Sequence, residues 1–377
     1  MKIIIVGTAY PLRGGIAHFN ALLAAHLSVR HSVETITFRR QYPGFLFPGT
    51  SQEEQGGVSD AAPAPQLIDS INPLSWGSVG RLIRRRKPDL VIFKYWLPFF
   101  GPCFGTIAST AKQNPGTKVL FICDNIIPHE RRPGDVLFTR YAFKRADYFI
   151  VQSDAVEKDL LRFFPRAVYR KVPHPVYENF GPAVPPDAAR KELGIGAGRT
   201  VLFFGYIRAY KGLGVLLDAL RIANSRPGEP RITALVVGEF YEDERKYRSR
   251  VAELGLENDV KFVAEYVPNS EVGRYFGAAD AVVLPYLSAT QSGIAQIAYH
   301  FDKPLIVTGV GGLAEVVRDG ETGFVVPPDS PDALAEALGK FFTPGVPERC
   351  ALAVQREKPK YSWDNFVGAI EQLREGR

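Results

Sequence analysis

The sequence contains few cysteines and no long hydrophobic run. Its three cysteines are far apart and none belongs to a CxxC pair, so neither a disulfide framework nor a zinc site is expected. The apolar run that follows Lys2 stops at Gly7, which is too short for the hydrophobic region of a signal peptide. No segment approaches the roughly 18 apolar residues of a membrane span. These absences predict a cytoplasmic protein that does not cross a membrane and has no cysteine-based zinc site.

Two familiar binding motifs are also missing. No GxGxxG segment is followed by an acidic residue about 20 positions later, which disfavours a dinucleotide-dependent dehydrogenase. No recognisable nucleic-acid-binding module accompanies the net charge of +6, so nucleic acid is disfavoured as a partner. The positive charge still suits an anionic lipid surface or a phosphorylated small molecule.

The composition is that of a globular protein with more than one domain. The chain has 377 residues, well above the roughly 150 of a typical domain, and 46% of them are hydrophobic against 23% charged. Short apolar runs alternate with segments long enough for helices, which is the α/β pattern of a parallel sheet. In the amino-terminal half these runs are Lys2 to Val6, Val33 to Phe38, Leu90 to Phe93, Val119 to Ile122 and Tyr148 to Val151.

A second α/β series follows a proline-rich segment. Residues 173–186 hold too many prolines for a helix interior or a central strand, so we expect the interdomain linker there. The apolar runs beyond it are Thr200 to Phe204, Ile232 to Val237, Val260 to Val263, Ala281 to Leu284, Leu305 to Val307 and Gly323 to Val326. The sequence therefore predicts two doubly wound Rossmann-like domains, with a ligand site in a cleft between the carboxyl ends of their strands.

Several loops at the expected strand ends have the composition of anion sites. Gly14 and Gly15 precede an amphipathic helix, where backbone amides could approach a phosphate, although a tight turn alone would also need glycine. Arg208 and Lys211 lie between a strand and an apolar helix, and they are either diphosphate ligands or solvated loop charges. Residues 284–294 place short hydroxyl side chains before a further helix, where they either cap it or bind phosphate.

These loops together resemble a known enzyme family. The paired glycines, Arg208 with Lys211, the strand Pro304-Leu305-Ile306-Val307 and the segment Val310 to Val326 are similar to those of retaining GT-B-fold nucleotide-sugar glycosyltransferases, of the family 4-like type. The resemblance covers nearly the whole chain. It implies an acceptor-side domain at 1–180, a donor-binding domain at 187–358, and a final helix at 359–377 that returns to the first domain.

The resemblance also implies roles for the anion loops. Arg208 and Lys211 would bind the donor diphosphate and neutralise the leaving group, while Gly14 and Gly15 approach it from the facing domain. No metal or other cofactor is expected, since the nucleotide sugar is a co-substrate.

One departure from the family pattern concerns two glutamates that usually stand eight positions apart. Counted back from Pro304, their positions hold Ala289 and Ile297. The stretch Ser288-Ala289-Thr290-Gln291-Ser292-Gly293 resembles a bacterial branch of the family, in which Thr290, Gln291, Ser292 and Gly293 would contact the donor instead. Glu239 follows another expected strand and is a second source of the missing carboxylate, unless it is simply a surface residue.

On the acceptor side, the segment after the strand Val119 to Ile122 resembles the family's His-Asn or His-Asp loop. Asp124 stands where the histidine often falls, so the resemblance makes it a catalytic candidate; a turn-capping aspartate is the equal alternative. Asn125 and His129 belong to the same loop. Trp96 lies among aromatic residues that follow the basic run Arg81 to Lys87. Basic residues beside aromatic ones suit an anionic lipid surface or a lipid-linked acceptor. The alternative is that the basic run is a solvated helix face and the aromatic segment a buried strand.

The sequence therefore predicts a glycosyltransferase that moves a sugar from a nucleoside diphosphate to an acceptor hydroxyl, with retention and without a metal, in glycan or glycolipid synthesis. It would be cytoplasmic or peripheral on the cytoplasmic face of a membrane. Two alternatives remain open: a nucleotide-sugar-binding protein that has lost its transfer activity, and a GT-B-fold nucleotide-sugar epimerase.

Overall fold

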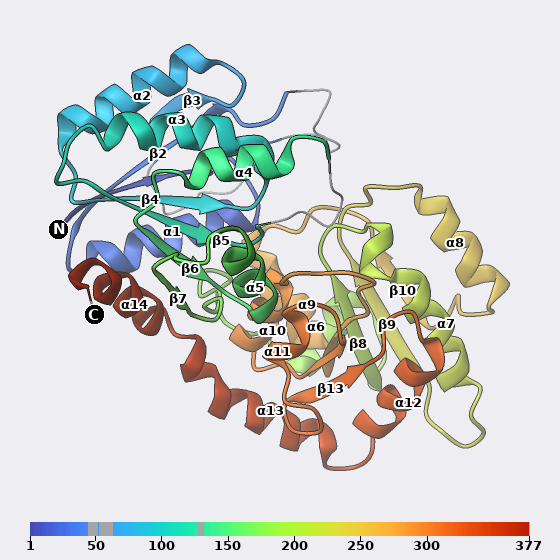
Figure 1. The fold of residues 1–377 in the computed structure, drawn as a ribbon. Coiled ribbons are helices and arrows are strands. Elements are labelled where there is room, and N and C mark those ends of the chain that lie inside the picture. Colours follow the sequence, from blue (N-terminus) through green and yellow to red (C-terminus); the bar gives the residue numbers. More distant parts are fainter. Residues whose placement is uncertain (44–51, 53–62, 127–131, 377) are drawn as a thin grey trace. The chain divides into compact units, whose positions relative to one another are not determined.

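The structure, a computed structural model, describes residues 1–43, 52, 63–126 and 132–376 (Figure 1). It divides into two compact units. The first unit comprises Met1–Pro175 together with Tyr361–Arg377, and the second comprises Val176–Lys360. The chain thus passes from one unit to the other inside the proline-rich segment and comes back just before its last helix.

The first unit is built on a seven-stranded parallel sheet with the order β3-β2-β1-β4-β5-β6-β7. Its strands are β1 (Lys2–Val6), β2 (Ser32–Arg40), β3 (Gln66–Asp69), β4 (Leu90–Tyr95), β5 (Lys118–Cys123), β6 (Tyr148–Val151) and β7 (Tyr169–Lys171). Its helices are α1 (Gly15–Ser28), α2 (Pro73–Arg86), η2 (Pro98–Phe100), α3 (Gly101–Ala111), α4 (Asp135–Phe143), α5 (Asp154–Phe163) and α14 (Trp363–Glu375). Helices α2, α3 and α4 lie on one face of the sheet, and α1 with α14 lies on the other (Figure 1).

The second unit has a six-stranded parallel sheet with the order β10-β9-β8-β11-β12-β13. Its strands are β8 (Arg199–Phe204), β9 (Ile232–Val237), β10 (Val260–Val263), β11 (Ala281–Leu284), β12 (Leu305–Thr308) and β13 (Gly323–Val326). Its helices are α6 (Pro186–Leu193), η3 (Ala209–Lys211), α7 (Leu213–Asn224), α8 (Glu244–Glu253), α9 (Asn269–Ala278), α10 (Gly293–His300), α11 (Leu313–Val316), α12 (Pro331–Phe341) and α13 (Val346–Glu357). The turn η4 (Lys358–Tyr361) leads back to the first unit.

Both sheets confirm the predicted fold class of two doubly wound parallel α/β domains. Their central strands are almost completely buried, as expected where helices cover both faces of a parallel sheet. The strand order reverses direction between β1 and β4 in the first unit, and between β8 and β11 in the second. At such a switch point the loops after the two central strands diverge, which leaves room for a ligand at their carboxyl ends. Each unit therefore has its own expected ligand position.

Helix α14 packs on the first unit although it is the last element of the chain. Ser362 caps it by accepting a hydrogen bond from the Asn365 amide, as serine commonly does at a helix start. Trp363 is buried, and its ring lies 5.2 Å from that of Phe19 on α1, measured between centroids. Phe366 meets the same Phe19 ring edge-on at 5.5 Å. Aromatic packing thus attaches the carboxyl terminus to the helix that follows β1.

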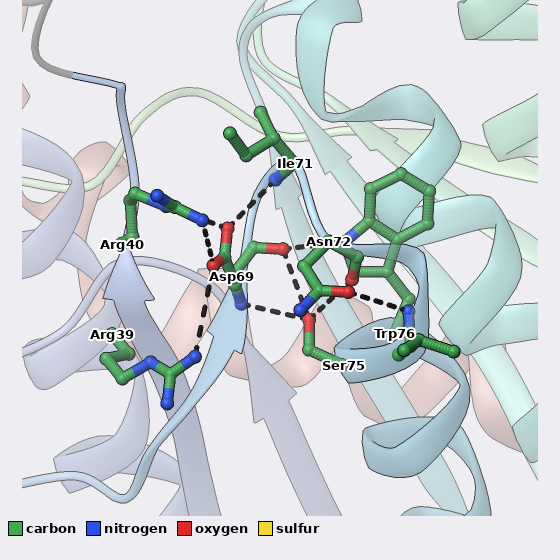
Figure 2. A network of polar contacts seen from close by, with 8 residues as sticks. Arg39, Arg40, Asp69, Ile71, Asn72, Ser75 and Trp76 are labelled. Atoms are coloured by element: carbon green, nitrogen blue, oxygen red, sulfur yellow. Dashed lines mark hydrogen bonds and ion pairs between the residues drawn. The ribbon is translucent and has the colours of Figure 1, made fainter.

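A polar network holds the edge strand β3, which the hydrophobic pattern did not predict (Figure 2). The Asp69 carboxylate accepts hydrogen bonds from the Arg40 guanidinium on β2, and the backbone carbonyl of Asp69 accepts one from the Trp76 indole at 2.7 Å. Ser75 bonds the Asp69 amide at 3.1 Å, and Asn72 caps α2. Side chains of β2 and α2 therefore add polar contacts that help to hold this short edge strand.

Among the residues that the structure describes, no helix combines the length and apolar character needed to span a bilayer.

Candidate functional site

The loop after β8 brings two cations to the switch point of the second unit. It runs from Gly205 through η3 to Gly212, which immediately precedes α7. Gly212 has a φ of 71°, and a Cβ added there would lie 1.9 Å from the carbonyl oxygen of Pro285, just beyond β11. Only glycine allows this approach. The loop therefore lies directly against the end of β11, which places Arg208 and Lys211 beside that strand end.

Lys211 is buried, although loop lysines are usually solvated. The residue is 8% exposed, and its ammonium lies 5.7 Å from the centroid of the Tyr286 ring. A Cβ added at Gly205 would be 3.2 Å from both the Lys211 Nζ and the Ile294 Cδ1, so the ammonium also adjoins the first turn of α10. Burial, together with the nearby Arg208 charge, lowers the pKa of Lys211 to about 7. An anion beside this ammonium would restore its proton.

Arg208 differs from Lys211 because it is exposed at the surface of the second unit. Its guanidinium carbon lies 4.8 Å from the centroid of the Tyr241 ring, and Tyr241 packs against Tyr206 at 4.6 Å between ring centroids. This cation–π contact limits the directions in which the guanidinium can point. Arg208 is thus available to a ligand and partly positioned in advance.

Three of the predicted donor-binding residues lie in the loop between β11 and α10, and a fourth begins α10. Ser292 precedes α10 without capping it through its side chain; instead its hydroxyl lies 3.2 Å from that of Tyr286. The Thr290 carbonyl accepts a hydrogen bond from the Gly312 amide at 2.9 Å. Gly293 is the first residue of α10. The helix thus begins with its first amides unoccupied by a side-chain cap, as a phosphate would require.

Gln291 has the least satisfied side chain of this loop. Both its amide nitrogen and its carbonyl oxygen are shielded from solvent, and neither has a partner in the part of the chain that the structure describes. A buried donor and acceptor left unpaired cost about 1–3 kcal/mol each, which a ligand hydroxyl or phosphate would recover. The two positions that hold glutamates in the resembled family, Ala289 and Ile297, are both buried and apolar.

Glu239 lies beside the Arg208 loop. It follows β9, and its backbone carbonyl accepts a hydrogen bond from the Ile207 amide at 2.9 Å, so the ends of β8 and β9 are tied together. Its side chain is partly buried. The structure therefore brings Glu239, Arg208, Lys211 and the loop before α10 to one edge of the second sheet.

In the first unit, the paired glycines and the acceptor-side residues lie at the carboxyl edge of the sheet. Gly14 precedes α1, which begins at Gly15, and no side chain caps that helix. Asp124 directly follows β5 and forms an ion pair with Lys94 of β4 at 2.5 Å between Oδ1 and Nζ. It is therefore more than a local turn cap. His129, the remaining member of the predicted loop, lies outside the described residues.

Trp96 and Asn125 contribute to packing next to this edge. The Trp96 indole donates a hydrogen bond to the Tyr42 hydroxyl at 3.0 Å, and its ring lies 4.5 Å from that of Phe100. The Asn125 amide reaches the Trp96 carbonyl at 3.4 Å. Trp96 is thus half-buried in an aromatic cluster, so most of its surface is engaged within the first unit.

Lys94 and Tyr286 are site residues that the sequence analysis missed. Lys94 interrupts the otherwise apolar strand Leu90–Tyr95, and a buried lysine is rare unless it is paired, so this interruption was a usable signal. Tyr286 gave no such signal, because an aromatic residue after a strand is ordinary.

Within the described parts of the chain, no group of three or more His, Cys, Asp and Glu side chains has the arrangement needed to hold a metal ion.

Comparison with known families assigns each unit separately. Residues 14–174 match the glycosyl transferase 4-like domain, and residues 198–343 match the glycosyl transferases group 1 domain. Among curated proteins, the D-inositol 3-phosphate glycosyltransferase of Streptomyces scabiei is 30% identical over 241 residues, which cover 61% of this chain and 54% of that protein. The corresponding enzyme of Corynebacterium urealyticum is 29% identical over 240 residues, covering 60% and 56%. The chain spans about half the length of these relatives.

Solved structures share the fold over the full chain. Sucrose-phosphate synthase from Thermosynechococcus elongatus superposes with a TM-score of 0.73 at 19% identity, covering 100% of this chain and 99% of that one. HepE from Anabaena, in complex with UDP, gives a TM-score of 0.75 at 18% identity with the same coverage. HepE has also been solved with UDP-glucose, for which the TM-score is 0.71 at 19% identity. These similarities establish the GT-B fold class.

Proposed function

Because the chain belongs to the glycosyltransferases that combine a 4-like domain with a group 1 domain, we propose that it transfers a sugar from a nucleoside-diphosphate sugar to an acceptor hydroxyl. The observation that carries this proposal is the pair of cations at the switch point of the second unit. Lys211 is buried beside the start of α10, and Arg208 is exposed and oriented by Tyr241. Nothing in an isolated α/β domain requires a buried, uncompensated ammonium there.

The proposed chemistry is electrostatic. Negative charge develops on the departing diphosphate as the sugar–oxygen bond breaks, and fixed cations and helix amides stabilise that charge most where water is excluded. Arg208, Lys211 and the first amides of α7 and α10 would supply this stabilisation. Because two side-chain cations take the place that a divalent metal occupies in other phosphoryl-leaving reactions, we propose a metal-independent reaction, with retention at the sugar.

We further propose a uridine diphosphate sugar as the first donor to test. HepE, a structural neighbour, has been solved with UDP and with UDP-glucose. The reaction would take place in a reducing, cytoplasmic compartment, where the free and buried cysteines Cys103, Cys123 and Cys350 would stay reduced.

A thermal-shift panel of nucleoside diphosphates and their sugars tests this function. A ligand at 100 times its dissociation constant stabilises the folded protein by about 2.7 kcal/mol, or several degrees in Tm. We expect such a shift with one nucleoside diphosphate and its sugar, and none with the corresponding nucleoside. If no nucleotide shifts the Tm, the donor site assigned to the second unit is wrong.

Binding of UDP is expected to take up close to one proton at pH 8. Free Lys211 is mostly neutral there because its pKa is about 7, and a diphosphate beside it would raise that pKa and return the proton. Below pH 6 the ammonium already carries its proton, so the uptake should vanish. Calorimetric titrations with UDP in Tris and in HEPES, whose ionisation enthalpies differ, measure the proton count.

Lys211→Met is the matched variant for this measurement, because it keeps the apolar stem and removes the titrating group. It should bind UDP without proton uptake at any pH between 6 and 8. A wild-type protein that binds UDP with no proton uptake at pH 8 would show that Lys211 does not face the diphosphate.

For the acceptor we propose a glycan or a lipid-linked hydroxyl at an anionic membrane surface. Helix α2 ends with a basic face, on which Arg81, Arg85 and Lys87 are exposed. Each basic residue near an anionic leaflet contributes about 1 kcal/mol of attraction, which salt screens.

Sedimentation with vesicles tests the membrane surface. We expect binding to vesicles that contain phosphatidylglycerol, little binding to pure phosphatidylcholine, and at least a tenfold weaker partition after Arg81→Glu with Arg85→Glu. Arg245→Glu with Arg248→Glu on α8 of the second unit is the control, because it makes the same charge change elsewhere. Equal losses in both variants would indicate non-specific attraction by net charge.

Buried Ala289 and Ile297, at the positions of the family glutamates, favour one alternative, a nucleotide-sugar-binding protein without transfer activity. Such a protein would give the thermal shift and the proton uptake but would never release free nucleoside diphosphate. An epimerase would change the sugar while it is still attached to the nucleotide. Analysis of the products after long incubation separates these outcomes.

A further inference from the structure

Polar side chains follow successive central strands of the first unit. Thr8 comes after β1, Lys94 is the fifth residue of β4, Asp124 follows β5, and Gln152 follows β6. Because parallel strands end at the same edge of a sheet, these side chains gather beside the switch point between β1 and β4. Only Asp124 was identified from the sequence, so the group as a whole needs an explanation.

Lys94 is the centre of this group. Its side chain is 1% exposed, and its Nζ lies 2.5 Å from the Asp124 Oδ1 and 3.3 Å from the Gln152 Oε1. The same ammonium lies 3.6 Å from the centroid of the Phe19 ring on α1. A carboxylate, an amide oxygen and an aromatic face thus surround one buried cation. Such a pair adds little to stability, because the cost of removing two charges from water offsets their attraction.

Burial lowers the pKa of Lys94, which the Asp124 charge opposes, and two neighbouring titratable groups add no charge beside the pair. Burial, followed by repulsion from Lys94, lowers the pKa of His174 to about 3, so this imidazole is neutral near pH 7. Burial, helped by repulsion from Asp124, raises the pKa of the Cys123 thiol well above its ordinary value, so it is neutral as well. Burial also raises the pKa of the Asp124 carboxyl, and the Lys94 ammonium opposes that rise. Lys94 is therefore the group that favours an ionised Asp124.

Hydrogen-bonding capacity remains unused around the pair. Asn20 donates to the Thr8 carbonyl at 2.9 Å, and a Cβ added at Gly7 would approach both the Asn20 amide nitrogen and the Lys94 side chain. The Asn20 carbonyl oxygen, the Thr8 hydroxyl and the Gln152 amide nitrogen are buried and have no partner among the described residues. Buried groups in native proteins are almost always paired, so three exceptions around one ion pair point to a ligand with hydroxyl groups.

We propose that Lys94 is a positioning residue, which holds the Asp124 carboxylate at the carboxyl edge of the first sheet as an acceptor of a hydrogen bond from an uncharged sugar hydroxyl. The proposal rests on the glycosyltransferase function proposed above. The resembled family often has a histidine at the position of Asp124, and a neutral histidine can donate as well as accept a hydrogen bond. A carboxylate only accepts, and it repels anions. The pair would therefore select a hydroxyl over a phosphate or a carboxylate at this position of the substrate.

The first test measures the ionisation of Asp124 without any activity. We would follow the carboxyl carbon by NMR in protein labelled with ¹³C-aspartate, and assign its signal by its loss in Asp124→Asn. In Lys94→Met the carboxyl should titrate at least one pH unit higher than in the wild type, because the opposing ammonium is gone. An unchanged midpoint would mean that Lys94 does not act on Asp124.

The second test measures release of UDP from UDP-glucose as a function of pH. An ionised Asp124 accepts the hydrogen bond more strongly than a protonated one, so activity should fall on the acidic side, and in Lys94→Met that fall should move to higher pH. The kcat should drop at least tenfold at pH 6, while the dissociation constant for UDP stays within threefold, because the cations of the second unit bind the nucleotide. A purely structural lysine would lower the fraction of active protein equally at every pH.

Two further variants separate the effect of Lys94 on Asp124 from a general loss of structure. Lys112→Met breaks the partly exposed pair between Lys112 and Asp147 in the same unit and should leave the pH profile unchanged. The double variant Lys94→Met with Asp124→Asn leaves no unpaired charge, so it should fold even if Lys94→Met does not, and it should remain at least tenfold slow. Recovery of wild-type turnover in the double variant would overturn the proposal. A wild type that neither binds nor consumes any nucleotide sugar of the panel would instead refute the proposed function, and the NMR titration would still decide whether Lys94 controls Asp124.

Discussion

Arg208→Ala is expected to lower the turnover of the nucleotide sugar by about 10²–10³-fold, the loss found when a single preorganised donor to a developing negative charge is removed. The fold should stay intact, because Arg208 is exposed and its recorded side-chain contact is with the face of Tyr241. Steady-state release of nucleoside diphosphate measures the turnover, and the Tm should change by no more than a degree or two.

Arg245→Ala is the matched control for this experiment. Arg245 is likewise exposed and belongs to α8 of the same unit, where it pairs with Asp243. It should retain full activity. If Arg208→Ala also stayed within a few-fold of the wild type, the diphosphate could not lie against the loop after β8, and the assigned donor site would be wrong.

Gly212→Ala is expected to remove donor binding and to destabilise the second unit. The added methyl would meet the Pro285 carbonyl oxygen at 1.9 Å, and the residue would have to keep a φ of 71°. Left-handed backbone in a residue other than glycine costs about 1–3 kcal/mol, and a steric overlap in a packed region costs a similar amount. The loop must move to relieve both, which displaces Lys211 and the first amides of α7. Thermal unfolding and UDP titration measure the two effects.

Gly214→Ala, two residues further along, is the matched control. A Cβ at that position has no atom within 4 Å, and the residue already lies in α7. Alanine there should raise the stability by up to about 1 kcal/mol and leave UDP affinity unchanged, because it favours the helix. Loss of UDP binding in both variants would mean that any change at the start of α7 is harmful. The loss of UDP binding in Gly212→Ala could then not be attributed to the contact between the loop and β11.

The central strands of both sheets could be predicted from the sequence because burial on both faces selects continuous apolar runs. Tyr148 to Val151 and Ala281 to Leu284 were predicted with the bounds that the structure gives. The two edge strands of the first unit were missed. β3 has only four residues, Gln66–Asp69, and is held by the Asp69 network, and β7 has three, Tyr169–Lys171. Such strands are stabilised by contacts with other elements, which leave no periodic pattern in the sequence.

The loops of the candidate site could be located from the sequence, but the state of their side chains could not. Arg208 and Lys211 looked alike as loop cations, yet Lys211 is buried beside Tyr286 and Arg208 is exposed. Burial depends on which strand ends lie next to each other, and that follows from the sheet order. Ser292 was expected either to cap α10 or to bind phosphate; it does not cap the helix, and its hydroxyl lies 3.2 Å from that of Tyr286. The Lys94–Asp124 pair joins residues 30 positions apart, which no local pattern indicates.

The central claim is that the second unit binds a nucleoside-diphosphate sugar and that the chain breaks its sugar–phosphate bond. The most direct measurement is the release of free nucleoside diphosphate from a panel of nucleotide sugars, by the wild type and by Arg208→Ala side by side. The account predicts steady release from at least one nucleotide sugar by the wild type, with at least a hundredfold slower release by the variant. Binding of a nucleotide sugar without any release over many hours, or equal release by both proteins, would contradict it.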